Sequence, residues 1–132
     1  MRSSTSSLLR RALLADATVS GATGALMLLA AGSLEGTLGV PATLLRYAGL
    51  SLLPFALFVG WLSRRQALPR ASVWAVIALN IAWAAGSVLL LVGGAIAPTL
   101  LGSVFVLVQA VAVAAFADLQ YFGLRRSAVT AG

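Results

Sequence analysis

Four long apolar stretches dominate this chain and limit it to one class of fold. They lie at about 8–31, 42–62, 71–92 and 98–120, and each supplies about the 20 apolar residues that a helix needs to cross the roughly 30 Å hydrocarbon layer of a bilayer. Inside that layer every backbone N–H and C=O must be hydrogen-bonded within the protein, and a helix satisfies this by itself. The sequence therefore predicts an all-α, polytopic membrane protein: a four-transmembrane-helix bundle that forms a single membrane domain, residues 1–132.

The composition supports this class and excludes several kinds of chemistry. Hydrophobic residues make up 61% of the chain and charged residues 9%, against roughly 45 to 50% and 25% in soluble domains. The chain has neither cysteine nor histidine, so it lacks the usual ligands of haem, iron–sulfur clusters and structural zinc. We therefore expect no metal site and no cofactor.

The arginines predict how the chain is oriented in the membrane. Arg46 stands alone near one side, whereas the others fall on the opposite side: Arg2, Arg10, Arg11, Arg64, Arg65, Arg70, Arg125 and Arg126. Cytoplasmic loops carry an excess of basic residues, so both termini and the segment 63–70 are expected in the cytoplasm. Because these arginines lie at helix ends and form no basic patch, we expect no nucleic-acid partner.

The first stretch could also be read as a cleaved export signal, because Arg10 and Arg11 precede an apolar run that ends in small residues. Its length and its internal Asp16 favour a retained transmembrane helix instead. The segment 32–41 contains three glycines and predicts a turn-rich loop, with Pro41 at the start of the next helix.

The second stretch carries two features that bear on packing. Pro54 lies near its middle and removes one backbone donor, which predicts a bend in the helix. Gly49, Ala56 and Gly60 share one side at helical spacing, and small residues in such a row let two membrane helices approach closely.

Polar residues inside the apolar stretches predict the faces that point into the bundle. Asp16, Ser20 and Thr23 lie on one strip of the first helix, and an acid in a membrane span faces protein or water rather than lipid. Asn80 and Gln109 lie near mid-membrane and are expected to be the nearest polar layer to Asp16. The full set of candidate interior or ligand-binding residues is Asp16, Ser20, Thr23, Asn80, Trp83, Ser87 and Gln109.

These residues support two readings, hydrogen bonding between helices or a ligand cavity with a proton path. Asp118 lies on the opposite face of its helix from Gln109 and is expected to pair with arginines, so the two aspartates do not form a catalytic pair. A nucleophilic triad in its usual form would need a histidine, which this chain lacks. We therefore expect no catalytic residues and no enzyme activity.

Two segments resemble known proteins: LLRYAGLSLLPFALFVGW at 44–61 and VWAVIALNIAWAAGSVLLL at 73–91 are similar to segments of small uncharacterised four-helix integral membrane proteins of bacteria. This resemblance implies a multi-pass protein of the bacterial inner membrane and no particular activity. The size of the chain and the acid in its first helix also resemble small multidrug resistance transporters. Those transporters place a glutamate there in a different sequence context, so no site is carried over from them.

Two functions remain open at this point. The first is an accessory or structural bundle that binds a partner, either a second copy in a homo-oligomer or a larger membrane complex. The alternative is a small transporter or ligand-binding bundle that uses the intramembrane Asp16. In both cases the lipid bilayer surrounds the protein.

Overall fold

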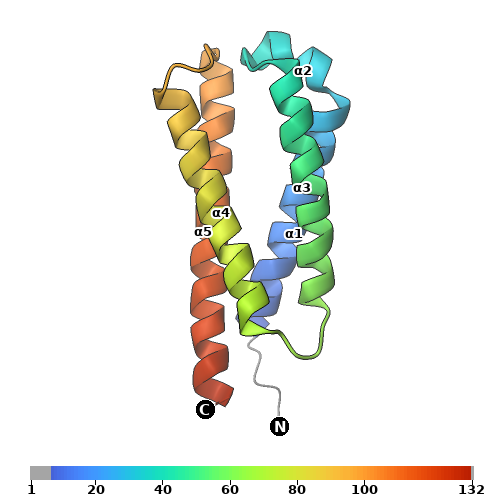
Figure 1. Ribbon diagram of the computed structural model, residues 1–132, viewed down its shortest axis with the longest axis vertical. Helices are drawn as coiled ribbons and strands as arrows, with labels where there is room; N and C mark the ends of the chain where they lie inside the picture. Colours follow the sequence, from blue (N-terminus) through green and yellow to red (C-terminus); the bar gives the residue numbers. More distant parts are fainter. Residues whose placement is uncertain (1–6, 132) are drawn as a thin grey trace.

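The computed structural model describes residues 7–131, all of which lie in helices or in short connections between them (Figure 1). The elements are α1 (Ser7–Leu29), α2 (Ala31–Leu38), α3 (Ala42–Ser63), α4 (Arg70–Val92) and α5 (Leu100–Ala131). Within the described residues, four helices are long and apolar enough to cross a membrane: α1, α3, α4 and the part of α5 from Leu100–Ser127. The predicted all-α protein with four candidate membrane spans is confirmed. Arg2, which contributes to the predicted orientation, lies outside the described residues.

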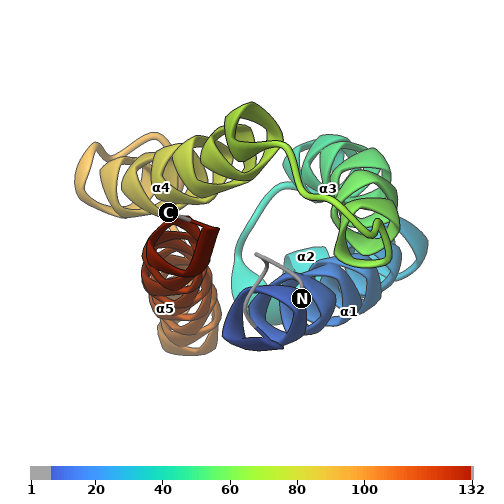
Figure 2. The same ribbon diagram turned by 90° about the horizontal axis from the view of Figure 1, so that it is seen from below.

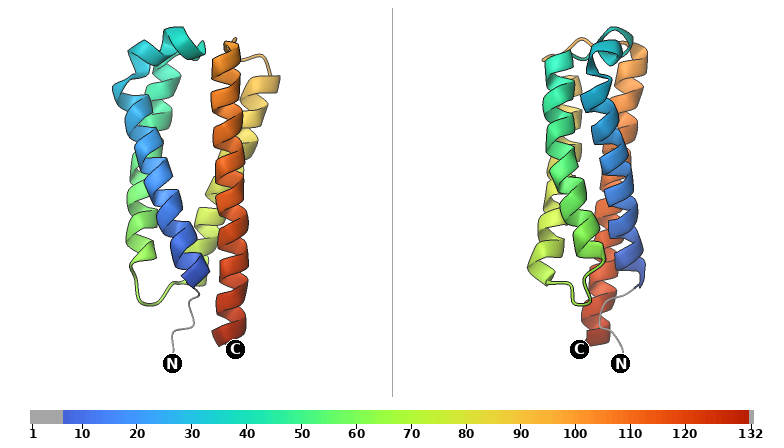
Figure 3. Two further views of the ribbon diagram at one scale, coloured as in Figure 1. Left: turned by 180° about the vertical axis from the view of Figure 1, so that it is seen from behind. Right: turned by 90° about the vertical axis from the view of Figure 1, so that its right-hand side faces the viewer.

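The long helices form a ring in the order α1, α3, α4, α5 when the bundle is viewed along its length (Figure 2). α1 packs mainly on α3 and α4 mainly on α5, while α1 also contacts α5. Figures 1 and 3 show these two pairs converging where α1 begins and α5 ends, which we call the closed end. They separate toward α2, which we call the splayed end.

The closed end is sealed by apolar side chains. Residues from all four long helices form one buried cluster there: Leu9, Leu13, Val59, Leu62, Val73, Val76, Ile77, Ala117 and Leu124. A second buried cluster around Met27, Leu38 and Leu45 lies at the splayed end and joins α1, α2 and α3.

Glycines hold α1 and α3 close together. A Cβ atom added to Gly49 would lie 2.6 Å from the carbonyl oxygen of Gly24 on α1, and one added to Gly24 would lie 2.9 Å from the Cβ of Leu52 on α3. Such distances leave no room for a side chain, so the predicted close approach along the second span is present in the structure. α3 remains helical through Pro54, and the bend there stays a prediction.

The segment predicted as a loop at 32–41 is largely helical, and this part of the prediction is wrong. α2 forms because Ala31, Leu34 and Leu38 recur at helical spacing and pack against the core of the splayed end. Gly39 ends the helix in a left-handed conformation, with φ of 69°, and its N–H donates to the Glu35 carbonyl oxygen. A glycine-rich segment thus becomes a short helix with an apolar face.

α5 begins at Leu100, two residues later than predicted, because Thr99 caps it. The Gly102 N–H donates to Thr99 Oγ1 at 3.1 Å. Thr99 in turn donates from its backbone N–H to the Leu38 carbonyl oxygen and from its hydroxyl to the Thr37 carbonyl oxygen, at 3.0 and 2.8 Å. These bonds fasten the start of α5 to the end of α2.

α5 also continues to Ala131 instead of ending near Gln120. Its additional turns are packed, because Leu124 is buried in the closed-end core and Gly123 lies directly against the backbone of Leu9. No proline follows Gln120 among the described residues, and the helix carries on past the predicted boundary and through Gly123.

Candidate functional site

Asp16 lies just above the closed-end core and has no exposed surface (0%). Ser20, one turn further along α1, donates a hydrogen bond from its hydroxyl to Asp16 Oδ1 over 2.9 Å. Residues four apart share a helix face, so α1 itself presents the carboxylate and its first partner to the interior.

Two amides from other helices complete the surroundings of this carboxylate. Asn80 of α4 donates from Nδ2 to Asp16 Oδ2 at 2.8 Å, and Gln120 of α5 donates from Nε2 to the same oxygen at 2.8 Å. Asn80 Nδ2 also lies 3.1 Å from Gln120 Oε1 and donates to it. We call Asp16, Ser20, Asn80 and Gln120 the carboxylate cluster.

Every contact in the carboxylate cluster matches the chemistry of its members. A carboxylate only accepts hydrogen bonds, and three donor side chains converge on Asp16. Hydrogen bonds between membrane helices contribute roughly 0.6 to 2 kcal/mol each. The cluster therefore links α1, α4 and α5 at one level of the bundle.

Arg10, six residues before Asp16 on α1, does not join this cluster. The Arg10 guanidinium donates to the carbonyl oxygens of Ser63 and Gln66, at 2.9 and 2.7 Å. Arg10 therefore fastens α1 to the end of α3 and to the connection that follows it.

Gln109, which we expected beside Asp16, lies at a different level, and Gln120 takes that place. The two glutamines are eleven residues apart on one face of α5, which corresponds to about 16 Å along the helix. The prediction ended this helix at Gln120 and so placed Gln120 at the membrane surface. The signal for the longer helix was the apolar sequence around Tyr121, Phe122 and Leu124.

Thr23 and Ser20 line a cavity of about 420 Å³ between α1 and α5, and Asn80 lines another of about 210 Å³ between α3 and α4. Asp16 lines neither of them. The cavities reach partners of the carboxylate but not the carboxylate itself.

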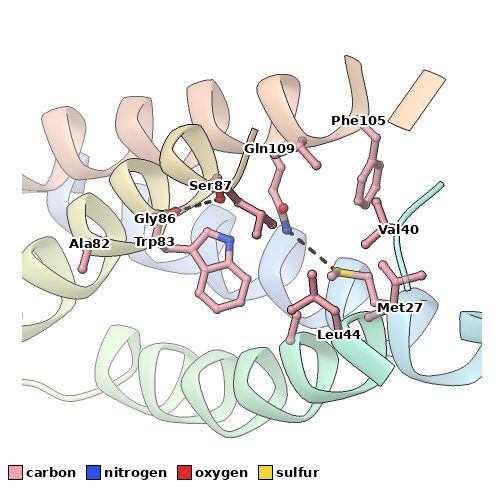
Figure 4. A pocket seen from close by; sticks show the side chains of 13 residues that line it. Met27, Val40, Leu44, Ala82, Trp83, Gly86, Ser87, Phe105 and Gln109 are labelled. Carbon is pink, nitrogen blue, oxygen red and sulfur yellow. Dashed lines mark hydrogen bonds between the residues drawn. The ribbon is translucent and has the colours of Figure 1, made fainter. Parts of the chain in front are cut away.

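The remaining candidates gather in a cavity of about 330 Å³ nearer the splayed end, which we call the Trp83 cavity (Figure 4). Trp83 and Ser87 come from α4, Gln109 from α5 and Met27 from α1. Ser87 donates its hydroxyl to the Trp83 carbonyl oxygen at 2.8 Å, and Gln109 Nε2 lies 3.9 Å from the Met27 sulfur.

The indole nitrogen of Trp83 is a buried donor without a partner, and within the part of the chain that the structure describes it is alone in this respect. A buried donor that lacks its hydrogen bond costs about 1 to 3 kcal/mol. In Figure 4 this nitrogen is turned toward the side of the cavity that Gln109 lines.

Asp118 stands apart from these groups, on an exposed groove between α4 and α5 lined by Ala84, Ala114 and Ala117. The expected separation from Gln109 is present. The expected pairing with arginine stays a prediction.

Comparison of the chain with protein-family models, with curated proteins and with solved structures found no match.

Proposed function

We propose that this chain is an accessory, non-enzymatic protein of the bacterial inner membrane, with both termini in the cytoplasm, that acts by packing against a protein partner in the bilayer. The observation that carries this proposal is the closed carboxylate cluster. Its members bond to one another across three helices and leave no side of Asp16 exposed.

A carboxylate that moves protons or cations needs access for its cargo, at least in one conformation. Asp16 instead lies between the sealed apolar core of the closed end and its own hydrogen-bond donors. This arrangement favours a structural role, in which the cluster fixes the positions of α4 and α5 along the bundle axis relative to α1.

The outer groove between α4 and α5 supports the partner-binding part of the proposal. Alanines make up half of the residues that line it, small residues let another helix approach closely, and Asp118 is exposed beside them. A charged group facing lipid costs roughly 2.5 to 3.5 kcal/mol at the bilayer centre on insertion scales, and less near the surface. A second copy or another membrane protein that covers this groove would remove that cost.

The alternative, a small transporter that uses Asp16, is favoured by one observation. The cavities lined by Ser20 and Asn80 approach the carboxylate cluster from the splayed side, while the apolar core closes the other side. This is the arrangement expected of a site with access from one side only.

Asp16→Asn and Asp16→Leu separate the two functions. Asparagine can present its oxygen to the amides of Asn80 and Gln120 and its NH₂ to Ser20, so we expect a loss below about 1.5 kcal/mol in the free energy of unfolding. Leucine leaves these amides unpaired and should cost about 3 kcal/mol. Unfolding of the purified full chain in detergent micelles by added denaturing detergent measures both values.

Proton flux into liposomes that contain the protein and a trapped pH-sensitive dye tests the alternative. We expect the native chain and Asp16→Asn to match empty liposomes. Flux above that background in the native chain, abolished by Asp16→Asn in correctly inserted protein, would establish the transporter function and overturn our proposal.

A further inference from the structure

We propose that the Trp83 cavity is a binding site for an uncharged lipophilic molecule that carries a hydrogen-bond-accepting oxygen of the ketone type, held by the indole N–H of Trp83. This site goes beyond the structural and partner-binding function proposed above. The residues that line it include no member of the carboxylate cluster, and it does not depend on Asp16.

The first argument is the unsatisfied donor. Trp83 Nε1 is buried without a hydrogen-bond partner, and the other polar groups around the cavity do not supply one. The Ser87 hydroxyl donates to the Trp83 carbonyl oxygen, and the Gln109 NH₂ group faces only the weakly accepting sulfur of Met27. Neither the Ser87 hydroxyl oxygen nor the Gln109 amide oxygen accepts a hydrogen bond from Trp83 Nε1. Two N–H donors thus border a space where a ligand oxygen would bond to them.

The second argument is the lining of the cavity, which selects an uncharged and apolar ligand. Within residues 7–131 no charged residue lines it, and most of its wall is aliphatic or aromatic, including Leu44, Leu45, Leu90 and Phe105. A largely apolar cavity of a few hundred cubic ångströms with a few polar groups is typical of small-molecule sites. Its 330 Å³ lies at the lower end of that size range.

The third argument concerns the route of entry. α3 and α4 separate toward the splayed end, and the lining residues Ala82 and Gly86 of α4 are exposed at the edge of the cavity (Figures 1 and 4). Both residues lie within a candidate membrane span. A lipophilic molecule could therefore enter sideways from the hydrocarbon layer without crossing an aqueous surface.

The depth of Trp83 in the bilayer favours such a ligand over an ordinary phospholipid. Trp83 precedes Val92, the end of α4, by nine residues, or about 14 Å along the helix axis. The hydrocarbon layer is about 30 Å thick, so Trp83 lies close to its middle, well below the ester carbonyls at its rim. An acyl chain could occupy the cavity but would bring no acceptor to the indole.

Benzophenone is a suitable probe, because it is an uncharged two-ring ketone that inserts into nearby C–H bonds under ultraviolet light. Diphenylmethane has the same rings without the oxygen and serves as competitor control. The full-length protein in phospholipid nanodiscs is labelled over a range of benzophenone-to-lipid ratios, and mass spectrometry locates and quantifies the products.

We expect saturable labelling of residues that line the Trp83 cavity, with Met27 and Leu44 among them. Trp83→Phe removes the donor and keeps an aromatic ring, and it should raise the half-saturating ratio about tenfold. Trp74→Phe is the matched control, since Trp74 packs on Tyr121 outside the cavity, and it should leave that ratio unchanged. Diphenylmethane should compete about tenfold less well than unlabelled benzophenone.

A second variant guards against an indirect effect of losing the indole. Gly86 lines the cavity, and a Cβ built on it would meet no atom within 4 Å, so Gly86→Leu adds bulk at the cavity while keeping Trp83 and should abolish the saturable labelling. Gly36→Leu, at an equally open glycine of α2 outside the cavity, should not. Circular dichroism and gel filtration check that each variant is folded.

Three results would each overturn the proposal. They are an equal half-saturating ratio in Trp83→Phe and the native chain, equal competition by diphenylmethane and benzophenone, and labels spread over the lipid-facing surface.

Discussion

At the residue scale, the bundle interior depends on which polar side chains find a partner and which do not. Asp16, Asn80 and Gln120 meet from three helices and satisfy one another, whereas the Trp83 indole N–H faces a cavity and bonds to none of the acceptors that line it. Because hydrocarbon offers no hydrogen bonds, polar atoms in a membrane protein must be paired within the protein or by a ligand. The first group therefore stabilises the fold, and the second is available for binding.

The two glutamines of α5 give a matched prediction at this scale. Gln120→Leu removes bonds to Asp16 and Asn80 and should lower the free energy of unfolding by about 2 kcal/mol. Gln109→Leu removes only the long contact to the Met27 sulfur and should cost less than about 0.5 kcal/mol. Denaturation in mixed micelles measures both. Equal losses would contradict the assignment of Gln120 to the cluster.

At the element scale, α1 and α3 pack against each other more extensively than any other two helices, because their glycines let the backbones come into contact. The pair formed by α4 and α5 is joined to them by the closed-end core, by the carboxylate cluster and by the contact between α2 and Thr99. α2 thus compensates for the separation of the long helices at the splayed end.

Gly49→Ala and Gly60→Ala test the contact between α1 and α3. The new Cβ at position 49 would lie 2.6 Å from a backbone oxygen of α1, so the helices must move apart, and we expect a loss of about 1 to 3 kcal/mol. At position 60 the nearest atom outside the helix is the Ala17 Cβ at 3.6 Å, an ordinary contact. Gly60→Ala should therefore be neutral or slightly stabilising in the same unfolding assay.

At the scale of the whole molecule, the four candidate spans place α2 and the connection at 93–99 at one end of the bundle, and the connection between α3 and α4 at the other end (Figure 1). The proposed orientation puts the arginine-rich closed end in the cytoplasm. Because the chain lacks cysteine, single cysteines can report on each end without background labelling.

Cysteines at Ser33, Ala95 and Gln66, all exposed in the structure, test this orientation. Ala95 is preferable to Gly94, whose φ of 75° disfavours a side chain. A membrane-impermeant maleimide added to intact bacterial spheroplasts should label the first two variants and leave Gln66→Cys unlabelled until the membrane is opened. The reverse pattern would show that the arginine bias does not set the orientation of this chain.

The sequence alone determined the fold class, the number of spans and the inward face of α1, because these follow from apolar length and helical periodicity along one segment at a time. It also identified Asp16, Ser20 and Asn80 as interior residues, since a polar side chain within an apolar helix is expected to face protein rather than lipid. The tertiary structure decided which glutamine of α5 meets Asp16, because that depends on how far the helix continues and how it slides against its neighbours. It alone revealed the helical form of α2 and the unpaired indole of Trp83, since both arise from contacts between segments far apart in the chain.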